Sequence, residues 1–178
     1  MSKKVLILSG SPRKGGNSDL LCDEFLRGAR EAGHEAEKLR VAEKRIAPCS
    51  GCYYCTARYG ACVHKDDMAE VLQKMIDADV IVLASPVYFY SINAQLKAVI
   101  DRFYANNDAL MGGKKAVLIT AMADTEMDSA LAANEMFRQM TGYLGWENAG
   151  VLNARNAPTA ADLSGDDLEQ AYALGKEL

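Results

Sequence analysis

Four of the five cysteines of this 178-residue chain fall within fourteen residues, at Cys49, Cys52, Cys55 and Cys62. Cysteine thiolates bind iron-sulfur clusters and zinc, and they are also redox-active groups themselves. The first three follow the spacing CxxCxxC, with which iron-sulfur ligand runs begin, whereas structural zinc sites usually pair two separated CxxC motifs. The pattern favours a 4Fe–4S cluster over zinc, leaves unoccupied thiols as an open alternative, and makes His64 a further candidate ligand.

A second candidate site is the segment 9–18, which reads Ser-Gly-Ser-Pro-Arg-Lys-Gly-Gly-Asn-Ser. Its glycines allow close approach of the backbone to a ligand, its hydroxyl and amide groups can donate hydrogen bonds, and a helical pattern follows it. A helix N-terminus with free N–H groups binds phosphate well. The segment matches neither GxxxxGK[ST] nor GxGxxG, so nucleoside triphosphates and dinucleotides are disfavoured. An ordinary strand-to-helix turn is the alternative.

A third candidate site is the aromatic segment 85–91, Ser-Pro-Val-Tyr-Phe-Tyr-Ser, which follows an apolar run. Tyrosine and phenylalanine side chains next to a proline can pack against a flat ring while backbone groups bond to its edge. The alternative interpretation is that Phe89 and Tyr90 only fasten a turn onto the core.

These three segments must be positioned by regular elements, and the hydrophobic pattern indicates which. Continuous apolar runs predict buried parallel strands, and apolar residues at i, i+3, i+4 and i+7 predict helices. Strands are expected at 5–8, 35–41, 80–84, 116–120 and 147–152, and helices at about 17–33, 68–76, 92–103, 126–144 and from about 164. Strict alternation indicates an α/β fold: a flavodoxin-like three-layer sandwich whose five-stranded parallel sheet has the order 2-1-3-4-5, with helices on both faces.

Length and charge limit the classes of function. The chain is expected to form a single domain over residues 1–178 with a cysteine-rich loop at about 41–65. Twenty basic and 24 acidic residues give a net charge of −4, so nucleic acid is not an expected partner. No apolar run reaches the ~20 residues of a membrane helix, and the first residues are too short for a secretory signal. We therefore expect a cytoplasmic protein.

Two of these motifs carry a resemblance to a known family. Gly10-Ser-Pro-Arg-Lys-Gly-Gly-Asn-Ser18 and Ser85-Pro-Val-Tyr-Phe-Tyr-Ser-Ile-Asn-Ala-Gln-Leu-Lys-Ala-Val-Ile-Asp-Arg102 resemble segments of the flavodoxin-like NAD(P)H-dependent FMN reductases. Within that group, Pro48-Cys-Ser-Gly-Cys-Tyr-Tyr-Cys55, followed by Cys62 and Lys65-Asp-Asp-Met68, is similar to the iron-sulfur flavoproteins.

The resemblance implies bound FMN, and it assigns residues to the two ends of that cofactor. The residues implied at the phosphate are Ser9, Ser11, Arg13, Asn17 and Ser18, and those implied at the isoalloxazine ring are Pro86, Val87, Tyr88 and Phe89. Tyr90 stands where the family commonly has glycine. The segment 121–124, a third flavin-lining loop in the family, lacks the glycines often found there.

The resemblance also implies an activity. We expect an FMN-dependent oxidoreductase that takes hydride from NAD(P)H and passes electrons to a small acceptor, such as a flavin or quinone, or to the iron-sulfur cluster. Tyr88 and Tyr90 would shape the nicotinamide and acceptor pocket, and no side chain is assigned as a catalytic acid. The alternative is a flavodoxin-like or ferredoxin-like electron carrier reduced by a redox protein, and a redox or metal sensor ranks third. Assembly as a homodimer or homotetramer is implied as well.

Overall fold

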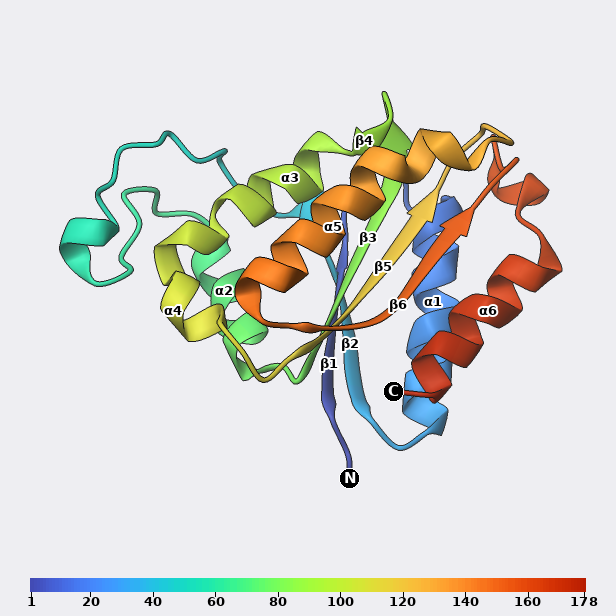
Figure 1. The fold of residues 1–178 in the computed structure, drawn as a ribbon, viewed down its shortest axis with the longest axis horizontal. Helices are drawn as coiled ribbons and strands as arrows, with labels where there is room; N and C mark the ends of the chain where they lie inside the picture. Colours follow the sequence, from blue (N-terminus) through green and yellow to red (C-terminus); the bar gives the residue numbers. More distant parts are fainter.

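The computed structural model describes residues 1–178 and is built on five long parallel strands. These are β1 (Lys4–Ser9), β2 (Glu35–Arg40), β3 (Val80–Tyr88), β5 (Lys115–Ala121) and β6 (Glu147–Ala154). They are hydrogen-bonded in the order β2-β1-β3-β5-β6 (Figure 1). When the parallel strands are numbered along the chain, this is the expected order 2-1-3-4-5, so the predicted flavodoxin-like arrangement is confirmed.

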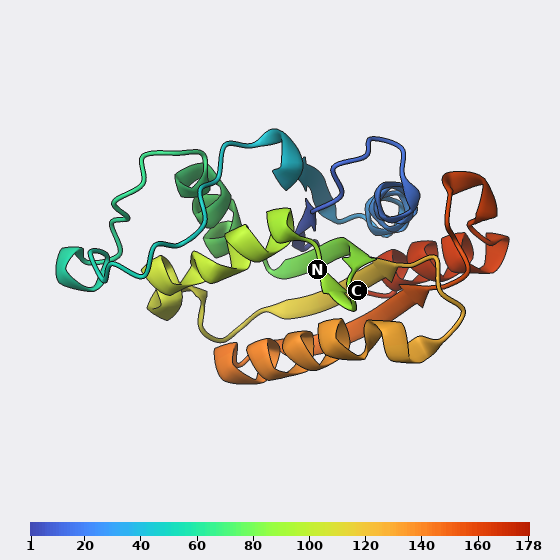
Figure 2. The same ribbon diagram turned by 90° about the horizontal axis from the view of Figure 1, so that it is seen from above.

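Helices cover both faces of the sheet. On one face lie α1 (Asn17–Glu31) and α6 (Gly165–Lys176), and on the other lie α2 (Met68–Asp77), α3 (Ala94–Asp101) and α5 (Leu131–Leu144), with the short α4 (Asn107–Leu110) beside them (Figure 2). Each predicted helix is present, although α3 begins at Ala94 and not at 92. A 3-10 turn over Phe103–Asn106 stands where this helix was predicted to end, and another over Met127–Ala130 stands where the helix predicted at 126–144 was to begin. None of the helices combines the length and the apolar composition that a membrane span needs.

The alternation of side chains along the buried strands explains why their apolar runs are continuous. Leu6 and Leu8 of β1 pack with Val71, Leu96 and Phe137 from the helices of the α2, α3 and α5 layer. The intervening positions of β1 pack on the opposite face, among the side chains of α1. Because both faces of the sheet are buried, both sets of positions are apolar, which gives the continuous apolar run typical of a parallel strand.

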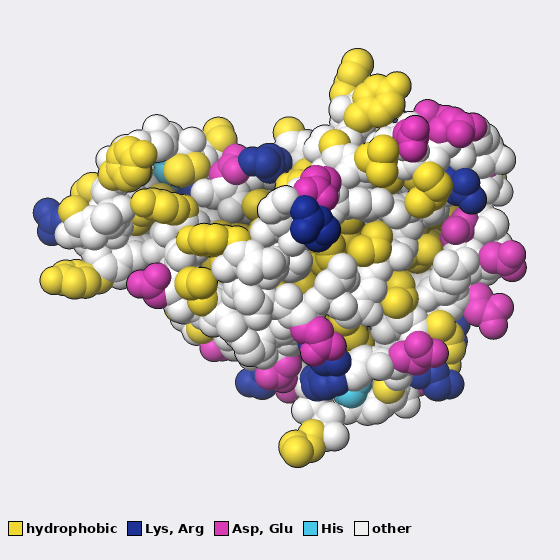
Figure 3. Space-filling model, in the orientation of Figure 1, with side chains coloured by type: hydrophobic (Ala, Val, Ile, Leu, Met, Phe, Trp, Pro, Cys, Tyr) yellow, Lys and Arg dark blue, Asp and Glu magenta, His cyan; other side chains and the backbone are white.

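The segment 85–91 differs from its prediction as a loop. Strand β3 continues through Tyr88, and the two-residue strand β4 (Ser91–Ile92) pairs antiparallel with its end. Phe89 and Tyr90 form the turn of this hairpin, with φ angles of +46° and +65°. A two-residue hairpin turn of this kind requires positive φ at both positions. The turn carries hydrophobic side chains that project above β4 (Figure 3).

The segment between β2 and α2 contains the four clustered cysteines and extends from one end of the molecule (Figures 1 and 2). Its only regular structure is two 3-10 turns, Val41–Glu43 and Thr56–Arg58. This agrees with the absence of hydrophobic periodicity at 41–65 in the sequence.

Candidate functional site

A cavity of about 470 Å³ opens at the carboxyl edge of the sheet, where the loops after β1, β3 and β5 meet. Residues 11, 13–18, 86–88, 121–123 and 157–160 line it. Residues 11 and 13–18 bring backbone N–H groups, the N-terminus of α1 and the cations Arg13 and Lys14, which together attract an anion. Residues 86–88 after β3 and residues 121–123 after β5 contribute mostly apolar surface. The cavity therefore suits a ligand with an anionic end and a flat apolar end.

The loop after β1 is held in shape by its own polar side chains. The Ser11 hydroxyl donates to the backbone oxygen of Arg13 and accepts from the backbone N–H of the same residue, both at 3.2 Å. The Asn17 amide donates to the carbonyl of Ala157. Ser18 lies at the start of α1 and is buried. Ser11, Arg13, Asn17 and Ser18, four of the residues implied at the phosphate, all line the cavity.

Gly10 is required where this loop passes the start of α3. A Cβ atom at Gly10 would lie 2.6 Å from Oδ1 of Asn93 and 2.8 Å from Cβ of Leu96. The Gly10 N–H donates to the carbonyl of Ala84 at 2.8 Å, and its carbonyl accepts from the Asn93 side chain. The close approach joins the first loop to β3 and α3.

Three residues expected at the site do not line the cavity. Ser9 is fully buried, and its hydroxyl donates to the Asp19 carboxylate at 3.4 Å. Phe89 is 98% exposed because β3 runs on past Pro86 and places residue 89 at the hairpin turn. Tyr90 shares that turn and does not line the cavity either, whereas Pro86, Val87 and Tyr88 do.

One wall of the cavity was missed from the sequence. Residues 157–160 follow β6, and the Ala157 N–H donates to the carbonyl of Met122 at 3.0 Å. The Asn156 N–H donates to the carbonyl of Asp124 at 2.9 Å, with Asn156 in the left-handed region at φ +51°. The signal for this wall was the Asn-Ala-Pro sequence directly after the last strand, which is typical of a turn at the carboxyl edge.

The four clustered cysteines line a second cavity, of about 370 Å³, together with His64, Arg102 and Tyr104 among others. This cavity shares no lining residue with the first. Cys49 and Cys52 are exposed and Cys55 and Cys62 are half-buried, and all four are free thiols. The hydrogen bond from the backbone of Tyr54, with a further one from Ser50, lowers the pKa of the Cys52 thiol.

The residues around this second cavity include thiols and nitrogens that can bind a metal, but they do not form a site for a single metal ion. No three His, Cys, Asp or Glu side chains lie close enough to hold a metal ion, so the expectation that the spacing alone brings the thiols together is not met. The loop between the thiols contains two left-handed residues, Gly51 at φ +65° and Tyr53 at φ +56°. Nε2 of His64 and Nε of Arg102 are buried without a hydrogen-bond partner. Four cysteine thiols around one cavity are the kind of donor set that a 4Fe–4S cluster takes.

Sequence comparisons relate the chain to known flavoproteins. The profile of the NADPH-dependent FMN reductase family matches residues 3–153. An iron-sulfur flavoprotein of Methanocaldococcus jannaschii is 48% identical over 99 residues, which are 56% of this chain and 51% of that protein. An iron-sulfur flavoprotein of Archaeoglobus fulgidus is 40% identical over 111 residues, which are 61% of this chain and 50% of that protein. The chain thus spans about half the length of the curated relatives it matches.

A comparison of structures agrees on the fold. An NAD(P)H:quinone oxidoreductase from Methanothermobacter marburgensis superposes with a TM-score of 0.78 at 19% identity, covering 99% of this chain and 96% of the other. At this level of identity the similarity concerns the arrangement of helices and strands, which is the one described above.

Proposed function

Because this chain belongs to the NADPH-dependent FMN reductase family, we propose that it binds FMN in the cavity at the carboxyl edge of the sheet and acts as an oxidoreductase. The reaction would take hydride from NAD(P)H and deliver electrons to a small acceptor such as a flavin or quinone. One observation carries the proposal: a single cavity joins an anion-attracting loop to an apolar wall. When bound, FMN supplies the hydride-accepting chemistry, and the protein supplies position and electrostatics.

In this proposal the loop after β1 holds the FMN phosphate. The backbone N–H groups at the start of α1 face the anion, and Arg13 and Lys14 add positive charge. Ser11 and Asn17 shape the loop through the contacts described above, and both line the cavity. Ser9, buried below the loop, supports it from the side opposite the cavity.

Pro86, Val87 and Tyr88 border the isoalloxazine ring in the same proposal, and residues 121–123 and 157–160 close the remaining walls. Tyr88 is 42% exposed, so its ring is able to pack against a nicotinamide or an acceptor at the mouth of the cavity. Tyr90 and Phe89 stand beside that mouth on the hairpin turn. The apolar walls exclude water from the ring and leave proton exchange to solvent at the open side.

The charge of Arg13 gives a first prediction. Arg13→Gln should weaken FMN binding about tenfold, the usual order of effect for one charge-assisted contact with a phosphate, and should leave riboflavin binding unchanged. Titration of the apoprotein with either flavin, followed by quenching of flavin fluorescence, measures both constants. Arg45→Gln is the matched control, since Arg45 has an 88% exposed side chain and does not line the cavity. Equal loss of FMN and riboflavin affinity in Arg13→Gln would contradict a phosphate role.

A 4Fe–4S cluster in the cysteine-lined cavity is the second part of the proposal. It is supported by the four thiols around one cavity, the two buried nitrogens without partners, and the iron-sulfur flavoproteins among the relatives. Cys49, Cys52, Cys55 and Cys62 would be the ligands. The cluster would accept electrons one at a time from a reduced flavin.

Iron content tests the cluster. Protein prepared without oxygen should contain iron and sulfide, and Cys52→Ala should lose most of both because a three-thiol site holds a cubane poorly. Cys22→Ala is the control, since Cys22 lies on the buried face of α1 and does not line the cysteine-lined cavity. The iron content of this variant should equal that of the unaltered protein. Zinc in place of iron, or equal iron in the two variants, would contradict this part of the proposal.

Three further predictions belong to the proposal and concern the chain as a whole. Residues 1–178 would work as one FMN-binding domain. The chain would assemble as a homodimer or homotetramer. Its place would be the cytoplasm, where thiols are kept reduced.

A further inference from the structure

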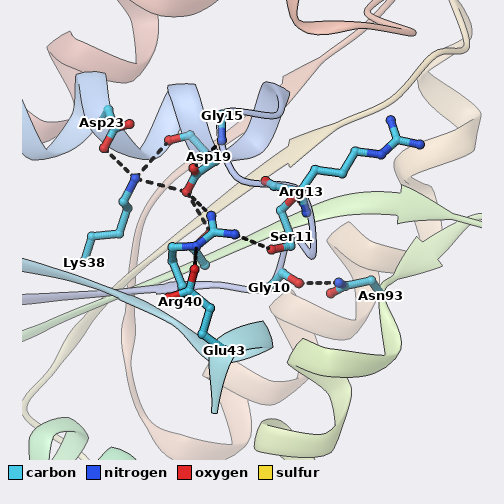
Figure 4. Close-up of polar contacts among 11 residues, drawn as sticks. Gly10, Ser11, Arg13, Gly15, Asp19, Asp23, Lys38, Arg40, Glu43 and Asn93 are labelled. Atoms are coloured by element: carbon cyan, nitrogen blue, oxygen red, sulfur yellow. Dashed lines mark hydrogen bonds and ion pairs between the residues drawn. The ribbon is translucent and has the colours of Figure 1, made fainter.

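A carboxylate lies buried directly beneath the proposed phosphate loop. Asp19, in the first turn of α1, is only 3% exposed. Its Oδ2 accepts the backbone N–H of Gly15 at 2.8 Å (Figure 4). Its Oδ1 accepts the Ser9 hydroxyl at 3.4 Å. The Asp19 side chain therefore fixes the loop from below, at a residue that takes the left-handed φ of +69°.

Two cations from the end of β2 face this carboxylate. Nζ of Lys38 lies 3.0 Å from Oδ1 of Asp19, and Nη1 of Arg40 lies 2.7 Å from the same oxygen in an ion pair too bent to be a hydrogen bond. Both cations are largely buried, with 15% and 11% of their side chains exposed. Lys38 also forms an ion pair with Asp23 at 2.5 Å, and Arg40 forms one with Glu43 at 2.7 Å; both acids are exposed.

The carboxylate stays ionised in this position. Burial alone would raise the pKa of Asp19, but the Gly15 N–H and the charges of Lys38 and Arg40 outweigh it, so that the pKa lies below its usual range. A fixed negative charge is thus held close to the loop at all physiological pH values.

The negative charge of Asp19 would oppose the binding of an anionic ligand in the loop unless nearby cations cancelled that charge. Lys38 and Arg40 provide that cancellation, and Arg40 also reaches the loop itself, since its Nη2 donates to the carbonyl of Ser11 at 3.5 Å. Figure 4 shows the Arg13 side chain extending away from this group of charges. The Arg13 side chain is therefore available to a ligand, whereas Arg40 binds the Ser11 carbonyl of the loop and the Asp19 carboxylate.

We propose that Asp19 and Arg40 are positioning residues for the phosphate loop: Asp19 holds the backbone at Gly15, and Arg40 cancels its charge and ties the Ser11 carbonyl, so that the loop stays receptive to an anion. This inference rests on the proposed function, because it takes the FMN phosphate as the anion. Neither side chain lines the cavity, so neither touches the ligand. Their effect passes through the loop and through the local field.

The test compares FMN with riboflavin, which has the same ring and no phosphate. Arg40→Gln should weaken FMN binding about tenfold and change riboflavin binding less than twofold, because the Asp19 carboxylate, then paired with Lys38 alone, repels only the phosphate. Adding Asp19→Asn to Arg40→Gln removes that carboxylate but keeps an oxygen for the Gly15 N–H. The double variant should therefore recover most of the lost FMN affinity.

Arg30→Gln is the matched control for a purely structural effect. Arg30 also joins α1 to β2, donating through Nε and Nη2 to the carbonyl of Ala36 at 3.2 and 2.9 Å, but it does so at the other end of the helix. Its ratio of FMN to riboflavin affinity should equal that of the unaltered protein. A parallel loss of both affinities in Arg40→Gln, or no recovery in the double variant, would overturn the inference. Failure of the unaltered protein to bind FMN would instead overturn the proposed function.

Discussion

Arg102→Met is expected to lower the free energy of unfolding by about 3 kcal/mol at pH 7, the usual cost of leaving one partner of a buried ion pair alone. The Arg102 side chain is 2% exposed, and its Nη1 and Nη2 donate to the two carboxylate oxygens of Asp66 at 2.8 and 3.0 Å. Nη1 also donates to the carbonyl of Ala47 at 2.9 Å. Methionine fills the space of the side chain but satisfies none of these acceptors.

Urea unfolding of the two proteins measures this difference. Lys97→Met is the matched control, since Lys97 forms an ion pair with Asp101 on the same helix and both side chains are more than 40% exposed. An exposed pair of this kind is worth at most about 0.5 kcal/mol. Equal losses in the two variants would contradict the special role of the buried pair.

The same ion pair predicts how the difference depends on pH. Hydrogen bonding from Arg102 lowers the pKa of Asp66 from its ordinary value of 3.8 to about 2. A lowered pKa contributes stability above the pKa of the unfolded chain, and this contribution is lost as the pH falls toward the folded value. The gap between the unaltered protein and Arg102→Met should thus narrow by about 2 kcal/mol between pH 5 and pH 2. A gap that stays constant over this range would exclude the carboxylate as its source.

The ion pair also connects the two ends of the cysteine-rich segment. Ala47 precedes the first clustered cysteine, and Asp66 follows the last one. Asp66 accepts the Ala47 N–H at 2.9 Å, and Arg102 contacts both residues from the end of α3. Loss of Arg102 should therefore loosen the cysteine-lined cavity as well as destabilise the fold.

Gly28→Ala is expected to destabilise the protein by about 3 kcal/mol, because two helices touch at this residue. A Cβ atom at Gly28 of α1 would lie 2.1 Å from the carbonyl oxygen of Tyr172 in α6. A Cβ at Gly175 of α6 would lie equally close to the carbonyl oxygen of Phe25 in α1. The backbones meet without side chains between them, so a methyl group at either glycine must push α6 away from α1.

Gly142→Ala tests whether this effect comes from packing and not from the loss of a helical glycine. Gly142 lies in α5, is exposed, and has no atom within 4 Å of the position a Cβ would take. Alanine there should stabilise the protein by about 0.5 kcal/mol through its higher helix propensity. If Gly28→Ala left the free energy of unfolding unchanged or raised it, as Gly142→Ala should, close contact between α1 and α6 would be contradicted.

The layers and the strand order were predictable because burial on both faces leaves a strong signal in the sequence. Val5 to Leu8 is an unbroken apolar run since its alternate residues enter two different cores. The position of the first loop followed from that strand and the helix after it. Local pattern was sufficient for these elements because each is determined by residues close together in the chain.

The hairpin and the ion pairs were not predictable in the same way. Phe89 and Tyr90 are not residues that favour the positive φ angles of a two-residue turn, so nothing in the segment indicated one. Arg102 and Asp66 are 36 residues apart, and Asp19 meets Lys38 and Arg40 only because α1 packs against β2. Contacts of this kind depend on the tertiary arrangement and have no local signature.

The most direct test of the central claim is a visible absorption spectrum of the protein prepared without oxygen, before and after NADPH or NADH is added. We expect flavin bands from bound FMN that are bleached by the nucleotide, because the cavity at the carboxyl edge would hold the flavin where a nicotinamide can reach it. Flavin bands that persist would indicate a carrier reduced by another redox protein. A colourless protein that does not take up FMN would contradict the account.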